Sequence, residues 1–411
     1  MLYFAVMGRA RQDTRTPQLV RRHAGDTRAT CGRHSMRGHS ANWATEQAEQ
    51  EIIRLCHAGL DSHALRRVVF ERLQRVMPYE AYWCATTDPS SSLFTSGVAD
   101  GFVSQEIPRY ISNEFFEDDY NKFGDLASRR CAVSTLQVAT HGDLRRSRRY
   151  REILEPAGLG HEMRAVFRSG GMTWGAMCLH RLRRFEDFTP AHVALFAAIT
   201  PHLATGLRAA LLLNAVEEAP AADGPGLLLV ADDYTVLSAT PAAELLLDEI
   251  RDQSQSSSLP IAILAVVTKL RALEDDGRSA AHVIPQGRLF TRANRWLSIH
   301  ASRLSRTAEG QIAVIIEQAT PHAIAPLVLQ AYSLTAREQE VAALVLKGLS
   351  TEDISARLCI STLTVQQHLK AIFAKVGVRS RRELVARIFA QSYWPAMANE
   401  YGLSPASWSP A

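Results

Sequence analysis

The side chains best suited to specific recognition in this 411-residue chain lie near its C-terminus, in residues 361–378. Gln366, Gln367 and Lys370 stand one, three and four positions apart, so they share one face of a helix. The apolar residues of another face are Val365, Leu369, Ile372, Phe373 and Val376. A glutamine amide can hydrogen-bond an adenine edge, and a lysine can reach the O6 and N7 atoms of guanine. The pattern predicts an amphipathic helix whose polar face can read bases.

Four short helices in a row are predicted around this stretch, because each begins with a capping signal. The predicted N-caps are Thr335, Ser350, Ser361 and Ser380. Gly348 and Gly377 stand where the first and third helices should end in a left-handed residue. Only residues 359–361 separate the second helix from the third. A turn this short is typical of a helix-turn-helix, whose second helix enters the DNA major groove.

The charge of this region is one-sided. Residues 357–387 contain seven basic residues and a single acidic residue, Glu383, which suits a phosphate backbone. The alternative is an ordinary helix with a solvated polar face, which would not require such asymmetry. We expect base contacts from Gln366, Gln367 and Lys370. The expected phosphate contacts come from Ser350, Thr351, Thr362, Thr364, Lys375 and Arg379.

Residues 334–388 resemble the LuxR-type DNA-binding domain. The shared motifs are an LTxRE opening at 334–338, Gly348, an I-S-x-x-T-V turn at 360–365, His368 and a K-x-G-V exit at 375–378. The resemblance implies an all-α, four-helix helix-turn-helix domain that reads double-stranded DNA as a homodimer and pairs through its last helix.

Two positions depart from the family pattern. Thr351 and Glu352 replace the usual Asn-Lys at the start of the second helix, and Gln366 replaces the common Lys or Arg. Glu352 weakens the case for a phosphate contact, and Gln366 suggests an altered base preference. The alternative function is therefore a sensor or interaction scaffold whose DNA-binding module is degenerate.

Residues 43–215 are predicted to form an α+β domain with a hairpin around Gly170-Gly171 and a long closing helix from Thr189-Pro190. The end of this segment resembles a GAF-type sensor domain. Tyr82, Trp83 and Trp174 are candidate ligand-pocket residues, because pockets in sensor domains have aromatic walls. Packing in the core is the alternative role for all three.

Residues 216–322 resemble a PAS-type sensor domain, also α+β. Two strands are predicted about Asp232-Asp233, followed by a helix near Thr240-Pro241. The rival interpretation is a receiver domain of a response regulator, because an acidic pair follows the first strand. Against it, Asp275-Asp276 follow a helical pattern and no lysine lies between 270 and 346.

Residues 1–42 are expected to be a disordered basic tail. The helix-turn-helix domain is expected over 329–392, followed by a flexible tail over 393–411. Residues 1–35 hold seven Arg and two Asp, and a start at Met36 is an alternative. Six cysteines without CxxC or metal spacing indicate a reducing cytoplasm. No stretch is expected to span a membrane.

The sequence contains no nucleophile elbow, phosphate loop, HExxH or GxGxxG pattern, so we expect neither an enzyme nor a cofactor or metal site. We expect a cytoplasmic transcriptional regulator that responds to an unknown signal. Its expected partners are double-stranded DNA, a second copy, a small-molecule ligand and RNA polymerase. We expect a parallel homodimer held mainly by the helix at 191–213, because this helix carries more apolar residues than one face needs. The DNA-binding modules are expected to pair only weakly, on DNA.

Overall fold

The computed structural model describes residues 33–101, 107–213, 224–251, 259–275, 285–291, 293, 295–304 and 311–392. The described residues from Ala44 onward form one compact unit. Helix α1 (Arg33–Cys56) begins inside the segment for which disorder was expected, so that expectation is wrong for residues 33–42. Residues 1–32 and the predicted C-terminal tail at 393–411 lie outside the described residues.

The N-terminal domain, residues 44–213, is built on a five-stranded sheet with the order β2-β1-β5-β4-β3. Its strands are β1 (Ala81–Thr87), β2 (Phe94–Asp100), β3 (Val133–Thr135), β4 (Leu159–Ser169) and β5 (Met172–Leu182), all paired antiparallel. Its further helices are α2 (Ser62–Val76), α3 (Ile107–Phe116), α4 (Phe123–Ser128), α5 (Leu136–Ala139), η2 (Leu144–Arg146), the π-helix η3 (Tyr150–Leu154) and α6 (Pro190–Leu213). Gly170 and Gly171 have positive φ angles and form the predicted turn between β4 and β5.

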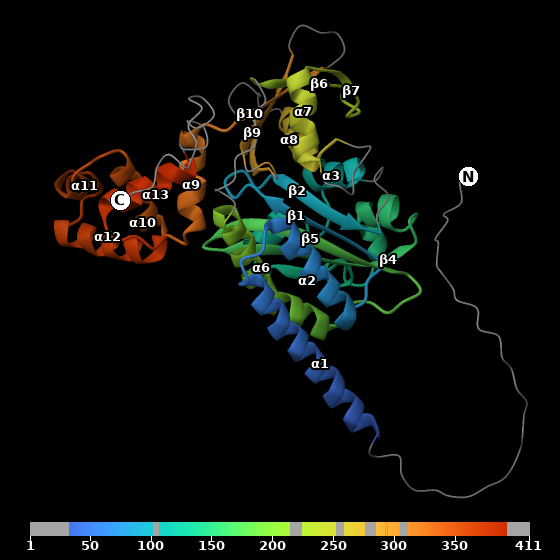
Figure 1. Ribbon diagram of the computed structural model, residues 1–411. Helices are drawn as coiled ribbons and strands as arrows, with labels where there is room; N and C mark the ends of the chain where they lie inside the picture. The colour runs from blue at the N-terminus through green and yellow to red at the C-terminus, as the bar shows by residue number, and fades with distance from the viewer. Residues whose placement is uncertain are drawn as a thin grey trace, which may run out of the picture. The chain divides into compact units, whose positions relative to one another are not determined.

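Helices cover both faces of this sheet. Helices α2 and α6 bury one face, and α3 and α4 lie over the other (Figure 1). Alternation along β1 sends Cys84 to the α2 and α6 side and Trp83 to the α3 side. The fully buried Phe70 and Phe196 each contribute ~1.5–3 kcal/mol through burial of apolar surface.

The apolar residues of helix α6 pack inside the chain. Leu195, Phe196, Ile199 and Leu203 are buried against the sheet and α2, so the apolar excess requires no partner. The expectation that no stretch reaches membrane-spanning length is wrong for this helix, because Pro190–Leu211 is long and apolar enough. Half of the most apolar 18-residue stretch of α6 is buried inside the protein, as in the core helix of a globular domain.

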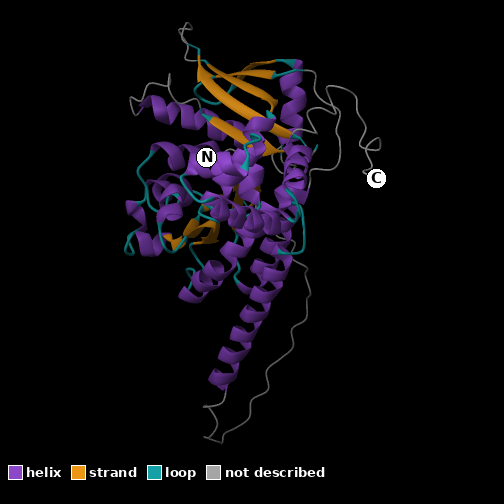
Figure 2. Cartoon of the chain, turned by 90° about the vertical axis from the view of Figure 1, so that its left-hand side faces the viewer, coloured by secondary structure: helices purple, strands orange, loops and turns teal. Residues whose placement is uncertain are grey.

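The central domain, residues 224–318, carries a second five-stranded sheet with the order β7-β6-β10-β9-β8. Figure 2 shows strands in orange and helices in purple. The strands are β6 (Gly226–Val230), β7 (Val236–Ala239), β8 (Gln286–Phe290), β9 (Trp296–Arg303) and β10 (Ile312–Gln318), and the helices are α7 (Pro241–Ile250) and α8 (Ile261–Asp275). Every strand pair in it is antiparallel. The receiver interpretation is therefore wrong, because a receiver needs parallel strands joined by crossover helices. Thr240 caps α7 as expected.

A connecting helix that the sequence reading did not anticipate, α9 (Pro321–Ala331), follows the central domain. Ile324, Leu327 and Val328 are buried, and α9 packs on α6, on α10 (Ala336–Leu346) and on α13 (Arg381–Ser392) (Figure 1). The C-terminal module, residues 334–392, comprises α10, α11 (Thr351–Leu358), α12 (Thr362–Val376) and α13. The chain is thus multidomain, with two sheet-containing domains before a helical module.

Candidate functional site

Capping contacts fix where the helices of the C-terminal module begin. Thr335 and Glu338 form a complete capping box for α10, and Ser350 forms one with Asp353 for α11. The Ser361 hydroxyl accepts a hydrogen bond from the Thr364 amide (3.1 Å) at the start of α12. These contacts confirm the predicted starts of the first three helices.

The fourth helix begins with a variant of the expected box. The Glu383 amide donates to the Ser380 hydroxyl (3.2 Å), but the Glu383 carboxylate accepts from the Arg379 amide (2.8 Å). The reciprocal bond therefore reaches one residue further back than in a full capping box.

The turn between α11 and α12 has the length expected for a helix-turn-helix. It consists of residues 359–361, and Cys359 takes the left-handed conformation with a φ of 52°. Gly348 and Gly377 also have positive φ, which confirms the predicted ends of α10 and α12. The tight turn therefore fixes α12 directly against α11.

Helix α12 has the predicted phase. Val365, Leu369, Ile372 and Val376 are buried in the core of the module, with Phe373 packed against it. Gln366, Gln367 and Lys370 are exposed. Among the described residues, no protein group hydrogen-bonds these three side chains, so a polar face with free donors and acceptors points outward. Leu363 lies near the start of the same helix and is 64% exposed.

Some of the predicted phosphate-contacting side chains already form hydrogen bonds within the chain, and others are exposed. The Ser350 hydroxyl is bound to Asp353 (2.8 Å), and the Thr364 hydroxyl to Ser361 (2.8 Å). Thr362 and Arg379 are exposed at the two ends of α12. Thr351 is half-buried in the first turn of α11.

Lys375 is engaged inside the module. Its Nζ donates to Glu338 Oε2 of α10 at 2.5 Å, and this carboxylate also accepts from the Thr335 amide at 2.7 Å. Burial alone would raise the pKa of Glu338, but the hydrogen bonds from Lys375 and Thr335 outweigh it and lower the pKa. The Lys375 ammonium thus joins α12 to α10. This contact within the module gives Lys375 a structural role that does not involve DNA.

The comparison with protein families assigns this module. A family described as bacterial regulatory proteins, luxR family, matches residues 332–388. These residues are a luxR-family DNA-binding domain. The match ends within α13 and leaves α9 and both sheet-containing domains outside it.

Curated relatives match this chain over short stretches. Proteins of Mycobacterium bovis and Mycobacterium tuberculosis named as HTH-type transcriptional regulators are 51% identical over 53 residues, which is 13% of this chain and 6% of theirs. The monoamine regulon transcriptional regulator of Klebsiella aerogenes is 48% identical over 54 residues, 13% of this chain and 24% of that protein. This chain thus spans under a third of the length of these relatives.

Solved structures give weaker likenesses over longer stretches. The Vibrio cholerae VqmA–ligand–DNA complex is 18% identical, covers 41% of this chain and 84% of that chain, and has a TM-score of 0.22. The Escherichia coli DhaR(N)–DhaL complex is 12% identical, covers 68% of this chain and 90% of that chain, and has a TM-score of 0.20.

The three aromatic residues predicted to line one pocket do not meet. Tyr82 stacks on Phe70 on the α2 side of the sheet, with ring centroids 4.5 Å apart. Trp83 points to the opposite face, because neighbouring residues of a strand alternate. Trp174 Nε1 donates to the Ser169 carbonyl oxygen (3.1 Å) at the β4–β5 turn. A shared pocket of all three is therefore wrong.

Of the three aromatic residues, only Trp83 lines a small cavity of about 20 Å³ on the α3 side of the sheet. Phe94 meets it edge-on at 4.9 Å between ring centroids, and Phe123 lies 5.8 Å away. Glu114 and Arg164 are the charged groups in its wall. Arg164 lies over the Phe123 ring at 3.9 Å and donates to Glu114 Oε2 at 3.0 Å. The cavity is apolar except at this ion pair.

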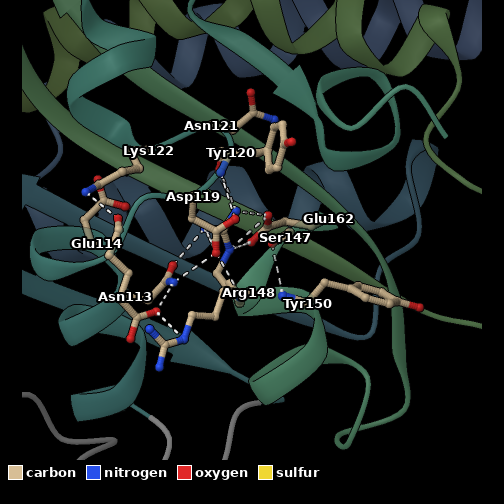
Figure 3. Close-up of polar contacts among 12 residues, drawn as sticks. Asn113, Glu114, Asp119, Tyr120, Asn121, Lys122, Ser147, Arg148, Tyr150 and Glu162 are labelled. Atoms are coloured by element: carbon tan, nitrogen blue, oxygen red, sulfur yellow. Dashed lines mark hydrogen bonds and ion pairs between the residues drawn. The ribbon is translucent and has the colours of Figure 1, made fainter. Parts of the chain in front are cut away.

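A buried polar cluster adjoins this ion pair, because Glu162 Oε1 lies 3.6 Å from Arg164 Nε. Figure 3 shows Glu162 with Asn113 and Asp119 of the cluster. Arg149, whose side chain is fully buried, donates to Glu162 Oε2 (2.7 Å) and to Asn113 Oδ1 (3.0 Å). Asp119 Oδ2 accepts from the Arg149 amide at 2.6 Å, and the Tyr110 hydroxyl donates to Glu162 Oε1 at 3.0 Å. The cluster ties α3, the segment before η3 and β4 together.

Charge pairing inside the cluster shifts its titration. Burial raises the pKa of Glu162, but Arg149 and Arg164 outweigh it and bring the pKa down to about 2. Burial lowers the pKa of His180 to about 4, so its imidazole is neutral at pH 7. Sequence reasoning missed this cluster. Arg148 and Arg149 are adjacent in an Arg-rich stretch, and only the structure shows that one is exposed and the other buried.

Proposed function

We propose that this protein is a transcriptional regulator in which two sensor domains control a DNA-reading C-terminal module. The observation that carries the proposal is the exposed, unpaired polar face of α12 on a luxR-family domain. In a helix-turn-helix such a face lies in the major groove. The one-sided charge of residues 357–387 supplies attraction to phosphates.

Gln366, Gln367 and Lys370 are the proposed base-reading residues. The amides suit adenine and the ammonium suits guanine, and each good base contact is worth roughly 1–3 kcal/mol of discrimination. The proposed phosphate contacts are Ser350, Thr351, Thr362, Thr364 and Arg379. Lys375 is a weaker candidate for a phosphate contact, because its ammonium already donates to Glu338.

A homodimer on DNA is proposed through α13. Leu384 and Ile388 face inward, whereas Val385 is 37% exposed on the outer side of the helix. Val385 of α13 is the proposed contact in place of α6, since Leu195, Phe196 and Ile199 of α6 are buried inside the chain. Two-fold symmetry then predicts an operator with two inverted half-sites.

The upstream domains are proposed to be GAF-like and PAS-like sensors. Helices on both faces of the first sheet and an antiparallel second sheet support this assignment. The cavity beside Trp83 is the proposed place for a small-molecule ligand, because its walls are aromatic with one ion pair. At about 20 Å³ it holds no more than a water molecule, so ligand binding requires the cavity to widen. We further propose a cytoplasmic location and RNA polymerase as a partner of the DNA-bound dimer.

One observation favours the scaffold alternative. Glu352 is exposed in the first turn of α11, where a carboxylate would face the phosphate backbone. Repulsion there weakens DNA binding without affecting the fold.

A binding selection tests the proposal. Full-length protein is incubated with a library of genomic fragments, and the bound fragments are sequenced and titrated at rising salt. If the protein is a regulator, we expect enrichment of an inverted motif and an affinity that falls as salt rises. A double variant, Gln366→Ala with Lys370→Ala, should lose the preference for that motif. No enrichment and no salt-dependent binding would establish the scaffold instead. Glu352→Lys is the matched variant, because it should restore binding if only the carboxylate prevents it.

A further inference from the structure

One arginine connects parts of the chain that lie far apart in sequence. Arg288 of β8 donates from Nε to Asp88 Oδ2 (2.9 Å) and from Nη2 to Asp88 Oδ1 (3.1 Å). Its backbone amide also donates to Asp88 Oδ2 (3.0 Å). Asp88 directly follows β1 of the N-terminal domain, so the pair joins the two sheet-containing domains across 200 residues.

The remaining side-chain nitrogen of Arg288 reaches the connecting helix. Its Nη1 donates to the Ala323 carbonyl oxygen in the first turn of α9 at 2.8 Å. We call the contact of Asp88, Arg288 and Ala323 the arginine clamp. It brings together the N-terminal domain, the central domain and the helix that leads into the C-terminal module.

The clamp is enclosed. The Asp88 side chain is fully buried and that of Arg288 is 13% exposed. The Ser90 amide donates to Asp88 Oδ1 (2.9 Å), which holds the carboxylate in position. Removing Arg288 therefore leaves the buried carboxylate of Asp88 without its counter-ion, a costly change.

Helix α9 is well placed to transmit this contact. It packs on α6 on one side and on α10 and α13 on the other, so its position sets where the C-terminal module stands. Leu327 and Val328 of α9 belong to the same apolar cluster as Val365 and Leu384 of the module. A shift of α9 must therefore move the module or open this core.

We propose that Arg288 is a positioning residue, through which both upstream domains hold α9 and thereby set the orientation of the DNA-reading module. The consequence for DNA rests on the proposed function. In a dimer with clamped modules, the distance between the two recognition helices is fixed, so one half-site spacing is preferred. An arginine is needed because a planar guanidinium can bind a carboxylate with two nitrogens and a carbonyl with the third.

Hydrogen exchange of the full-length protein without DNA tests the contact itself. Asp88→Asn and Arg288→Lys keep the size of each side chain but remove the charge or the planar fork. Both should speed exchange of the α9 amides about tenfold or more, since a hydrogen bond to a charged group is lost. The matched control is Arg271→Lys, because Arg271 donates to the Asp232 carbonyl oxygen (2.8 Å) within the central domain. Exchange of α9 in Asp88→Asn equal to that in the control overturns the clamp.

Operator spacing separates positioning from simple stabilisation. Half-sites found by the binding selection are placed at the natural spacing and with five additional base pairs, half a helical turn. The wild type should prefer the natural spacing, and both clamp variants should lose most of that preference while binding a single half-site unchanged. An unchanged spacing preference with faster α9 exchange would make Arg288 merely structural. Failure of the wild type to bind DNA would refute the proposed function, and the exchange result would still decide whether the clamp exists.

Discussion

The sharpest prediction concerns Lys375, whose ammonium is bound to Glu338 rather than free for DNA. Its side chain is 35% exposed and that of Glu338 only 7%. Exposed ion pairs contribute about 0.2–1 kcal/mol, and breaking a buried pair costs roughly 3–5 kcal/mol. This pair lies between the two limits, and Glu338 keeps its bond from the Thr335 amide. Lys375→Ala should therefore lower the stability of the C-terminal module by about 1–2 kcal/mol.

The pH dependence of that loss has a definite sign. Because the pKa of Glu338 is lowered in the folded chain, the ion pair stabilises the module at neutral pH. The contribution is lost as the pH falls from the ordinary glutamate value, about 4.3, through the lowered one. Hydrogen exchange of the α10 and α12 amides in the full-length protein measures the stability lost by Lys375→Ala at pH 7. Thermal melts of wild type and variant at falling pH show whether the difference in stability disappears.

The control variant is Lys370→Ala, since Lys370 lies on the same helix and is exposed. It should leave α10 exchange unchanged. A Lys375→Ala protein with normal exchange, weaker binding to every DNA sequence and a salt slope shallower by about 0.9 would refute the reasoning and assign Lys375 to a phosphate.

Three further outcomes are expected. Lys370→Ala should cost roughly 1–3 kcal/mol of specific DNA binding while non-specific binding changes little, as read from competition titrations. Leu369→Ala should cost about 2–5 kcal/mol of module stability in urea melts, and an unshifted melt would mean that α12 is phased wrongly. Glu162→Gln should destabilise the N-terminal domain by roughly 3–5 kcal/mol, because Arg149 loses its buried partner. The pKa of Glu162 is held at about 2, so wild type should lose this advantage as the pH falls from about 4 toward 2, and urea melts across that range should converge with the variant.

Local signals made the C-terminal module predictable. A capping hydroxyl, the glycine after a helix and the apolar spacing of α12 each act within a few residues, and the observed helix boundaries and buried face follow them. The same holds for the Gly170-Gly171 turn and for Thr240 at the start of α7. In each case the residues that carry the signal are also those that make the contact.

Contacts between distant segments were not predictable in this way. The partners of Arg149 come from α3, from the segment that follows α3 and from β4, and no spacing in the sequence relates them. Tyr82 and Trp83 were both predicted to line a ligand pocket, yet strand alternation sends them to opposite faces of the sheet. Helix α6 seemed too apolar for one molecule because the sequence does not show that it is enclosed on several sides.

The clamp between Asp88 and Arg288 also implies an order of events as the chain folds. Asp88 and Arg288 lie 200 residues apart, so bringing them together in an unfolded chain costs conformational entropy. We therefore expect this contact to form only after both sheets have folded and shortened the loop between the two residues. The N-terminal sheet, whose β1 and β5 pair between Ala81 and His180, can form during synthesis before residue 288 has been added. Weakening the clamp should therefore accelerate unfolding and hardly change the rate of folding. The chain secures its DNA-reading module only after both upstream domains have folded, so a molecule with a misfolded upstream domain carries a module that is not held in place.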